Sequence, residues 1–304
     1  MKKRADMTGF NTGKSLTDCI NDVMKSKNSV RTKRNDLIKL GLKAGDIEYI
    51  FSKFVAKETK GDFDFSKLTF GIEIECYNVE RTRLIEEGSA QGLNIRSCGY
   101  THAHTEYYKI ASDSSIAGIN PNEVVTPVLK GKRGMSSLKK LCKSLEAVDA
   151  KVNRSCGLHV HIGAQYITDE HYIRIFSNYQ HIERAIDSFM PQSRRDNNND
   201  YCHTLITHNF SGCHTKRDVM RELGFDRYHK VNAEAYAAHK TIEFRQHSGT
   251  VSYDKINHWV LFLAKLVEYS FKNEIKETIF DIESIPFLTD KEKEYFINRR
   301  ATLN

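Results

Sequence analysis

A change in the pattern of apolar and polar residues divides the chain near residue 60. Before this point, large apolar side chains are few, whereas after it short apolar runs alternate with amphipathic segments. The residues in between, 57–62, are charged and include a glycine, which is typical of a linker. We therefore expect a polar tail and a helical hairpin in residues 1–60 and a larger domain in residues 61–304.

The N-terminal segment has two parts. Residues 1–30 are polar and predict a loose tail with at most partial helix. Residues 30–54 contain two short amphipathic segments around Gly41 and Gly45, which predict a helical hairpin. The hairpin could be half of a DNA-binding helix-turn-helix. An element that docks on the main domain is the favoured interpretation, because no third recognition segment follows.

The main domain predicts strands and helices in alternation. Five strands are expected at residues 68–76, 106–111, 123–129, 158–163 and 241–247. Three helices are expected at residues 136–149, 168–190 and 252–272, with Ser136, Thr168 and Ser252 as N-caps. Pro127 lies inside a predicted strand, so that strand should be bulged there or lie at an edge of the sheet.

Three of the predicted strands carry charged residues and histidines on the face opposite their apolar one. In residues 68–76, the alternation turns Glu73 and Glu75 to the same face, about 7 Å apart along the strand. The polar positions of the three strands are Glu73, Glu75, His159, His161, Glu243, Arg245 and His247, and Glu123 begins a fourth strand. A solvated sheet face is the plain interpretation of one such strand taken alone.

Taken together, these positions favour a metal site. Lysine is absent from the polar positions of the three strands, and two carboxylates on one strand repel each other unless a cation lies over them. The oxygen-rich set suits Mg²⁺ or Mn²⁺. Zinc is the less favoured alternative, on the ligand-like residues Cys156, His159, His161, Cys98, His102 and His104.

Composition narrows the class of protein. The 304 residues carry a net charge of +7, which permits anionic partners such as nucleotides but does not by itself indicate nucleic acid, so no nucleic-acid partner is expected. No apolar run is long enough to span a membrane, and the basic N-terminus lacks the apolar stretch of a signal peptide. With 7 irregularly spaced cysteines, we expect reduced thiols and a cytoplasmic location. Neither a P-loop nor a Rossmann glycine motif occurs.

The order of several short motifs resembles the amidoligase family of ATP-dependent carboxylate–amine ligases, which are related to glutamine synthetase and glutamate–cysteine ligase. The matching segments are Phe-Gly-Ile-Glu-Ile-Glu at 70–75, Asp-Ser-Ser-Ile at 113–116, Glu-Val-Val-Thr-Pro-Val at 123–128, Cys-Gly-Leu-His-Val-His-Ile at 156–162, Arg194, Arg195, Asn232 and Thr-Ile-Glu-Phe-Arg-Gln-His-Ser-Gly-Thr at 241–250. The resemblance covers roughly residues 63–270. It implies an α+β fold with a curved, mainly antiparallel sheet of the glutamine synthetase type and helices on one face.

The resemblance also implies roles for individual residues. The divalent ions would be bound by Glu73, Glu75, Glu123, His159 and Glu243. His161 would approach the nucleotide, Arg245 would meet the transferring phosphate, and Glu243 and Arg245 would be the catalytic pair. The substrate would be bordered by Asp113, Arg194, Arg195 and Asn232. The family more often has glycine after the aspartate, where this chain has Ser114, which puts the tightness of that turn in doubt.

The expected activity is therefore formation of an amide bond from a carboxylate and an amine, with ATP and Mg²⁺ or Mn²⁺, through an acyl phosphate. Two other classes use the same residues. A metal-dependent hydrolase or nuclease could bind two ions with these carboxylates. A binding or scaffold protein could keep the sheet without catalysis, although such a protein has no reason to retain carboxylates that repel each other.

Overall fold

The computed structural model of the chain describes residues 14–26, 30–47, 49–50, 65–99 and 105–303. The chain divides into two compact units. The smaller comprises residues 1–62 with 166–168, and the larger comprises residues 63–165 with 169–304.

The smaller unit is helical. Helix α1 (Leu16–Lys25) precedes α2 (Val30–Lys39), and residues 44–47 and 49–50 are also helical. The α1 N-terminus is capped by Ser15, whose Oγ accepts the Asp18 N–H at 3.2 Å. A small core is formed by Met24, Leu37 and Ile47, one from each helical part. Within the described residues, α1 lies in the segment expected to be a tail with partial helix, and α2 and the helical residues 44–47 and 49–50 lie in the segment expected to be a helical hairpin.

The larger unit is built on one open, mostly antiparallel sheet in the order β2-β3-β4-β1-β6-β8-β7, with β5 paired to β1. The strands are β1 (Thr69–Cys76), β2 (Ile95–Ser97), β3 (Tyr108–Ser112), β4 (Asn122–Val125), β5 (Leu129–Lys130), β6 (Gly157–Gly163), β7 (Val231–Asn232) and β8 (Thr241–Ser248). Among these strands, the parallel pair is β2 with β3. The predicted α+β class and mainly antiparallel sheet are confirmed.

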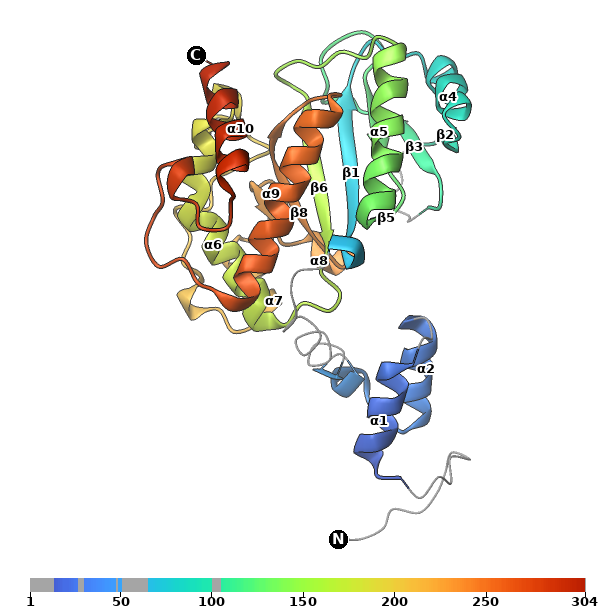
Figure 1. Cartoon of the computed structure of the whole chain (residues 1–304), viewed down its shortest axis with the longest axis vertical. Coiled ribbons are helices and arrows are strands. Elements are labelled where there is room, and N and C mark those ends of the chain that lie inside the picture. Colours follow the sequence, from blue (N-terminus) through green and yellow to red (C-terminus); the bar gives the residue numbers. More distant parts are fainter. Residues whose placement is uncertain (1–13, 27–29, 48, 51–64, 100–104, 304) are drawn as a thin grey trace. The chain divides into compact units, whose positions relative to one another are not determined.

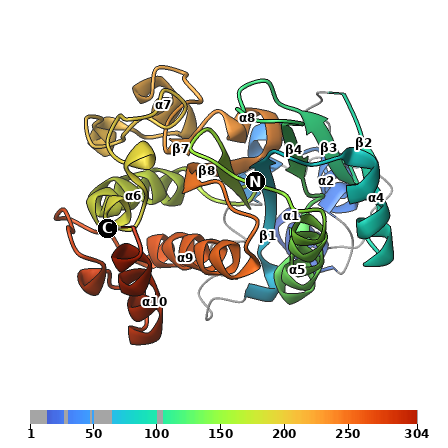
Figure 2. The same cartoon turned by 90° about the horizontal axis from the view of Figure 1, so that it is seen from above.

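The helices of the larger unit are α4 (Arg81–Ala90), α5 (Gly131–Ala147), α6 (Asp169–Ser188), α7 (Lys216–Glu222), α8 (Ala235–His239), α9 (Tyr253–Lys272) and α10 (Asp290–Ala301). Helices α5 and α9 lie across one face of the sheet, as Figures 1 and 2 show. On β1, Phe70, Ile72 and Ile74 are buried, and the Phe70 ring approaches Gly134 of α5. The apolar face of β1 is thus the one under the helices, and its carboxylates lie on the other face.

Two predicted elements differ from the structure in detail. The prediction of a helix capped by Ser136 was wrong, because α5 begins five residues earlier and Ser136 donates from within it to the Lys132 carbonyl oxygen at 3.0 Å. At Pro127 the predicted strand is divided into β4 and β5. Val125 pairs with Glu73, and Leu129 pairs with Phe70. Between these pairs, the three residues 126–128 therefore lie opposite the two residues 71–72 of β1. The bulge predicted at Pro127 is confirmed.

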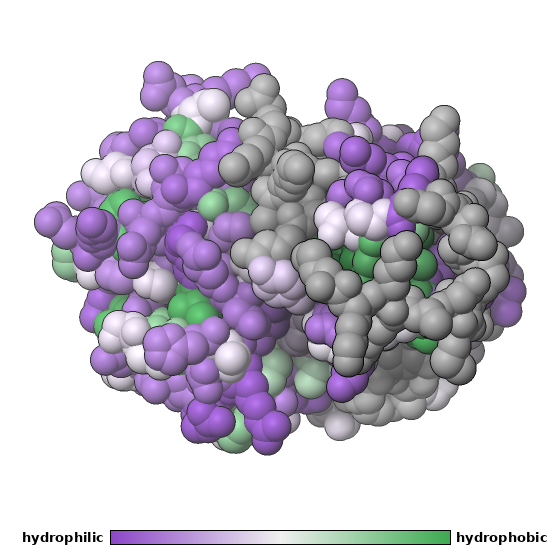
Figure 3. Space-filling view, turned by 90° about the horizontal axis from the view of Figure 1, so that it is seen from below, coloured by the Kyte–Doolittle hydropathy of each residue, from purple (hydrophilic) through white to green (hydrophobic). Residues whose placement is uncertain are grey.

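The surface seen from below is mostly hydrophilic where described residues are visible, with hydrophobic residues in small separate spots (Figure 3). None of the helices in the described part of the chain combines the length and the apolar character that a membrane span needs.

A buried ionic network joins α6 to the sheet. The Lys230 ammonium donates to Glu183 at 2.8 Å and to Asp187 at 2.7 Å, and both carboxylates belong to α6. Gln246 of β8 donates to the same Asp187 oxygen at 2.5 Å. Lys230 and Glu183 are completely buried, so each charge depends on the other for its stabilisation.

We predict that Lys230→Met lowers the free energy of unfolding by about 3–5 kcal/mol, because it leaves two buried carboxylates without their cation. Urea denaturation followed by circular dichroism measures the change. Lys151→Met is the matched control, since its partner Asp149 is exposed and the pair should contribute less than about 1 kcal/mol. Equal midpoints for Lys230→Met and the wild type would show that the network is not stabilising.

Candidate active site

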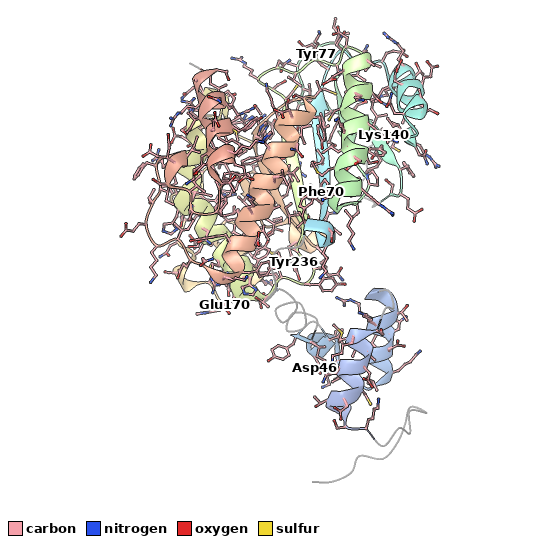
Figure 4. The ribbon with its side chains drawn as sticks, viewed as in Figure 1. Asp46, Phe70, Tyr77, Lys140, Glu170 and Tyr236 are labelled. Atoms are coloured by element: carbon pink, nitrogen blue, oxygen red, sulfur yellow. The ribbon has the colours of Figure 1, made fainter. Side chains whose placement is uncertain are left out.

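A cavity of about 830 Å³ lies over the polar face of the sheet. Its floor comes from β1, β3, β4, β6 and β8, and β1 runs from near Phe70 to Tyr77, which Figure 4 labels at its two ends. The strand register places Glu73 opposite His159 and Glu75 opposite Glu123. It also places His161 opposite Glu243. Residues far apart in sequence thus become neighbours through backbone pairing.

Two groups of three potential ligands form on this floor and share one histidine. The first contains Glu73, His159 and Glu243, and the second contains Glu75, Glu123 and His159; within each, the ligand atoms lie within 4.8 Å of one another. His159 Nδ1 is 3.0 Å from a Glu73 oxygen and 3.5 Å from a Glu243 oxygen. His159 Nε2 is 3.5 Å from a Glu75 oxygen. The two ring nitrogens therefore face different carboxylate groups.

Electrostatics in the cluster is dominated by burial and by like charge. Burial raises the pKa of Glu123 to about 9, and the charges of Glu73 and Glu75 add to this effect. Burial also acts against ionised Glu73, but hydrogen bonds from His159 and His161 hold its pKa well below the usual range. A further positive charge among the carboxylates would favour the state in which all of them are ionised.

These donors fit a hard divalent cation. Carboxylate oxygens with one imidazole are a ligand set that suits Mg²⁺ or Mn²⁺. The zinc alternative gains no support from Cys156, whose thiol bonds Asn153 Oδ1 at 3.8 Å and which joins neither ligand group among the described residues. His102 and His104 lie outside the described residues.

Two buried arginines line the cavity in different electrostatic situations. Arg245 Nη1 donates to Glu243 at 2.5 Å, so its charge is paired within the cluster. Arg194 is 4% exposed, and its Nη2 donates to the Cys156 carbonyl oxygen at 2.6 Å. Its Nε has no hydrogen-bond partner, and no carboxylate of the described residues lies within ion-pair distance of it. A buried, unpaired guanidinium beside a cavity indicates a site for an anionic ligand.

The approach of Arg194 also explains the glycine at the start of β6. A Cβ on Gly157 would lie 3.3 Å from Arg194 Nη2 and 3.0 Å from His159 Nε2. The Gly157 N–H itself donates to Glu75 at 2.5 Å. The first residue of β6 therefore orients a carboxylate on one side and leaves room for a guanidinium on the other.

The remaining predicted substrate residues occupy different places. Asp113 lines the cavity, and its Oδ1 accepts the Ser115 N–H at 2.8 Å, which closes the turn without a glycine after the aspartate. Asn232 also lines the cavity and donates to Glu243 at 2.6 Å. Arg195 does not line it; its Nε donates to the Met190 carbonyl oxygen at 2.7 Å.

His247 is not on the polar floor, although the strand alternation predicted it there. Its ring packs against Trp259 of α9 with centroids 5.5 Å apart. Burial, together with the nearby charge of Arg299, holds the pKa of His247 well below its usual range. The departure occurs where β6 and β8 lose their regular register near Leu158, so the simple two-residue period fails at this end of the strand.

The structure adds cavity residues that the sequence analysis did not select: Lys109, Tyr201, Arg227, Tyr228 and Glu234. Lys109 of β3 is buried. It pairs with Val125 of β4, which in turn pairs with Glu73 of β1. The alternation of residues along β3 could have identified it. The Tyr201 and Tyr228 rings meet edge to face at 5.4 Å, and both belong to segments without a periodic pattern.

Comparison with protein families agrees with the arrangement of these residues. Residues 66–267 match the family described as "Putative amidoligase enzyme". The chain belongs to this amidoligase family. A comparison with curated proteins finds no match. The matched range begins just before β1 and ends within α9, so it contains every strand of the sheet and both ligand groups.

Proposed function

We propose that this amidoligase is an ATP-dependent carboxylate–amine ligase that acts through an acyl phosphate, with a sheet of the glutamine synthetase type in residues 61–304 as its catalytic domain. The observation that carries the proposal is the presence, in one cavity, of two acidic ligand groups sharing His159 and a buried, unpaired Arg194. The first feature suits metal-bound phosphates, and the second suits an anionic substrate.

The metal ligands in this proposal are Glu73, Glu75, Glu123, His159 and Glu243. Mg²⁺, or Mn²⁺ in its place, would neutralise charge on the triphosphate of ATP. His161 would approach the nucleotide from the floor, where its Nδ1 is 2.9 Å from Thr241 Oγ1 and its Nε2 is 3.3 Å from a Glu73 oxygen. Asn232 would hold Glu243 in place through the hydrogen bond described above.

The proposed reaction has two steps. The carboxylate oxygen of the donor attacks the γ-phosphorus of ATP, the bond from that phosphorus to the β-phosphate oxygen breaks, and ADP leaves. The amine nitrogen then attacks the carbonyl carbon of the acyl phosphate, phosphate leaves, and a nearby carboxylate accepts the proton that the nitrogen loses. Arg245, fixed by Glu243, would stabilise the charge that develops on the transferred phosphoryl group.

The unpaired arginine suits the anionic carboxylate donor of a ligase, and the use of ATP is what separates a ligase from a hydrolase on the same carboxylates. A buried cation without an acid is costly, and its cost is removed when an anionic group binds. The carboxylate donor supplies such a group. Asp113, at the same cavity, would border this substrate as well. The amine is the second substrate of the proposed reaction. We also propose a cytoplasmic location for the protein, because its 7 free thiols fit a reducing compartment.

We predict that ATP binds only in the presence of Mg²⁺ and that Glu73→Ala abolishes this binding, because the triphosphate needs the ions held by the acidic groups. Isothermal titration of ATP, with and without Mg²⁺, measures both effects. Glu146→Ala is the control, since this exposed glutamate belongs to α5 on the other face of the sheet. Metal-independent ATP binding, or none by the folded wild type, would contradict the proposal.

A second prediction concerns the donor. Arg194→Met should raise KM for the carboxylate donor about tenfold or more and leave ATP affinity unchanged, since it removes a charge-assisted bond to that substrate alone. ADP release in a screen of carboxylate and amine pairs provides the assay. Arg195→Met is the matched control, because the neighbouring arginine does not line the cavity. A loss of ATP affinity equal to the loss of donor affinity would assign Arg194 to the nucleotide instead.

A further inference from the structure

The long connection between α6 and β7, residues 189–230, supplies one wall of the cavity. Two of its aromatic side chains, Tyr201 and Tyr228, line the cavity, and we call this pair the tyrosine wall. Arg245 Nε donates to the Tyr201 carbonyl oxygen at 3.4 Å, and Arg245 Cζ lies 5.9 Å from the centre of the Tyr228 ring. The tyrosine wall therefore lies against the arginine that is proposed to meet the transferred phosphoryl group.

Three histidines connect the two halves of this wall. His203 and His229 form a parallel bridge, in which the His203 N–H donates to the Tyr228 carbonyl oxygen at 2.7 Å and the Lys230 N–H donates to the His203 carbonyl oxygen at 2.8 Å. The centre of the His229 ring is 6.0 Å from that of His203 and 5.0 Å from that of His208. We call these three residues the histidine cluster. Its backbone bridge holds the tyrosines side by side.

The hydrogen bonds of the cluster define where a proton would add. His208 Nδ1 donates to the Glu222 carbonyl oxygen at 3.0 Å, and His229 Nδ1 donates to the Asp226 carbonyl oxygen at 3.1 Å. A ring nitrogen that faces a carbonyl oxygen carries a hydrogen, so Nε2 is the atom of each ring that takes up a second proton. The two ligand groups described above contain none of these histidines, and the cluster is therefore interpreted through its proton equilibria.

The groups around His229, which is 6% exposed, divide into those that oppose its protonation and those that favour it. Burial is the largest influence and lowers the pKa of His229 below its ordinary value. The charges of His208 and His203 act in the same direction. The Asp226 carboxylate, and the hydrogen bond to the carbonyl oxygen of the same residue, act in the opposite direction.

The helices packed against the cluster add two further carboxylates. On α7, a Glu222 oxygen lies 3.6 Å from His208 Nδ1. On α6, Gln180 donates to the His208 carbonyl oxygen at 2.6 Å, and Glu183 is paired with Lys230 in the buried network. Glu222 is thus the carboxylate that would stabilise a proton on His208, whereas Glu183 already balances a cation.

Closure of the wall and protonation of the cluster oppose each other. A histidine whose pKa is lower in the closed state than in the open one binds a proton less tightly when the wall is closed. The closed wall is therefore fully stable above the ordinary histidine pKa of about 6.5 and loses stability as the pH falls below it. A second proton among rings that are this close adds repulsion between like charges.

We infer that the histidine cluster is an acid-sensitive clasp, which in its neutral form holds the tyrosine wall against Arg245 and in its protonated form releases it. The clasp itself goes beyond the proposed function, and its effect on Arg245 rests on that function. Tyr228 then acts as a positioning residue for Arg245, because its ring limits where the guanidinium can lie.

Hydrogen exchange followed by mass spectrometry tests the clasp, with protection corrected for the intrinsic exchange rate at each pH. In the wild type, the amides of His203 and Lys230 should lose protection about tenfold between pH 7.5 and pH 5.5, because opening takes up a proton. In His229→Gln, whose amide can donate to the Asp226 carbonyl oxygen but does not titrate, this loss should be absent. His214→Gln is the matched control, since this exposed histidine of the same connection lies outside the cluster, and it should keep the full loss.

A second variant keeps the test decisive if His229→Gln does not form the bridge even at pH 7.5. The double variant His203→Gln/His208→Gln changes two half-buried rings and should reduce the pH-dependent loss at least twofold. Wild-type protection that is equal at both pH values would overturn the clasp, as would a loss that is undiminished in both variants. A loss of equal size in β1 and β6 would indicate acid unfolding of the whole unit and would also overturn it.

The effect on Arg245 has its own measurement. Tyr228→Leu should lower kcat for ADP release about tenfold with little change in the KM for ATP, because a misplaced guanidinium weakens stabilisation of the transition state. Tyr228→Phe keeps the ring and should keep the rate. An unchanged kcat in Tyr228→Leu would overturn the positioning role. Absence of ATP-dependent turnover in the wild type would overturn the proposed function, whereas the exchange experiment needs no turnover and judges the clasp separately.

Discussion

Repulsion between carboxylates is the constraint around which the larger unit is organised. Backbone pairing among β1, β4, β6 and β8 brings four glutamates to one cavity floor, although they lie far apart in the sequence. The neighbouring histidines and Arg245 offset part of this charge, but Glu123 remains so disfavoured as an anion that its pKa rises to about 9. A divalent cation completes the neutralisation, and a phosphate ligand then has positive charge to bind.

The opposite face of the sheet supplies the rigidity that such a cluster needs. Lys230 connects the two faces: its ammonium pairs with Glu183 and Asp187 of α6, while its carbonyl oxygen accepts the Arg245 N–H at 2.8 Å. Arg245 in turn fixes Glu243. The buried network of Lys230, Glu183 and Asp187 thus helps to position Arg245 and Glu243. The strands that carry the repelling carboxylates are held together by backbone pairing and packing.

The sequence predicted the parts of the site that regular alternation controls. Glu73, Glu75, His159 and Glu243 lie where the two-residue period of their strands puts them, whereas His247 departs at an irregularity that no period encodes. The short elements β2, β7 and α8 were missed, because two to five residues are too few for a period and tertiary contacts hold them, and the longer helices α4, α7 and α10 were missed as well. Glu234 was missed for the same reason, since only the fold brings it beside Asn232.

The central claim is that the acidic cluster binds divalent ions beneath the phosphates of a nucleotide. The most direct measurement is anomalous diffraction from crystals grown with Mn²⁺ and a non-hydrolysable ATP analogue. The account predicts manganese peaks between Glu73, His159 and Glu243 and between Glu75, Glu123 and His159, with phosphate oxygens as further ligands. Ordered analogue without manganese at these residues, or manganese bound elsewhere in the cavity, would contradict it.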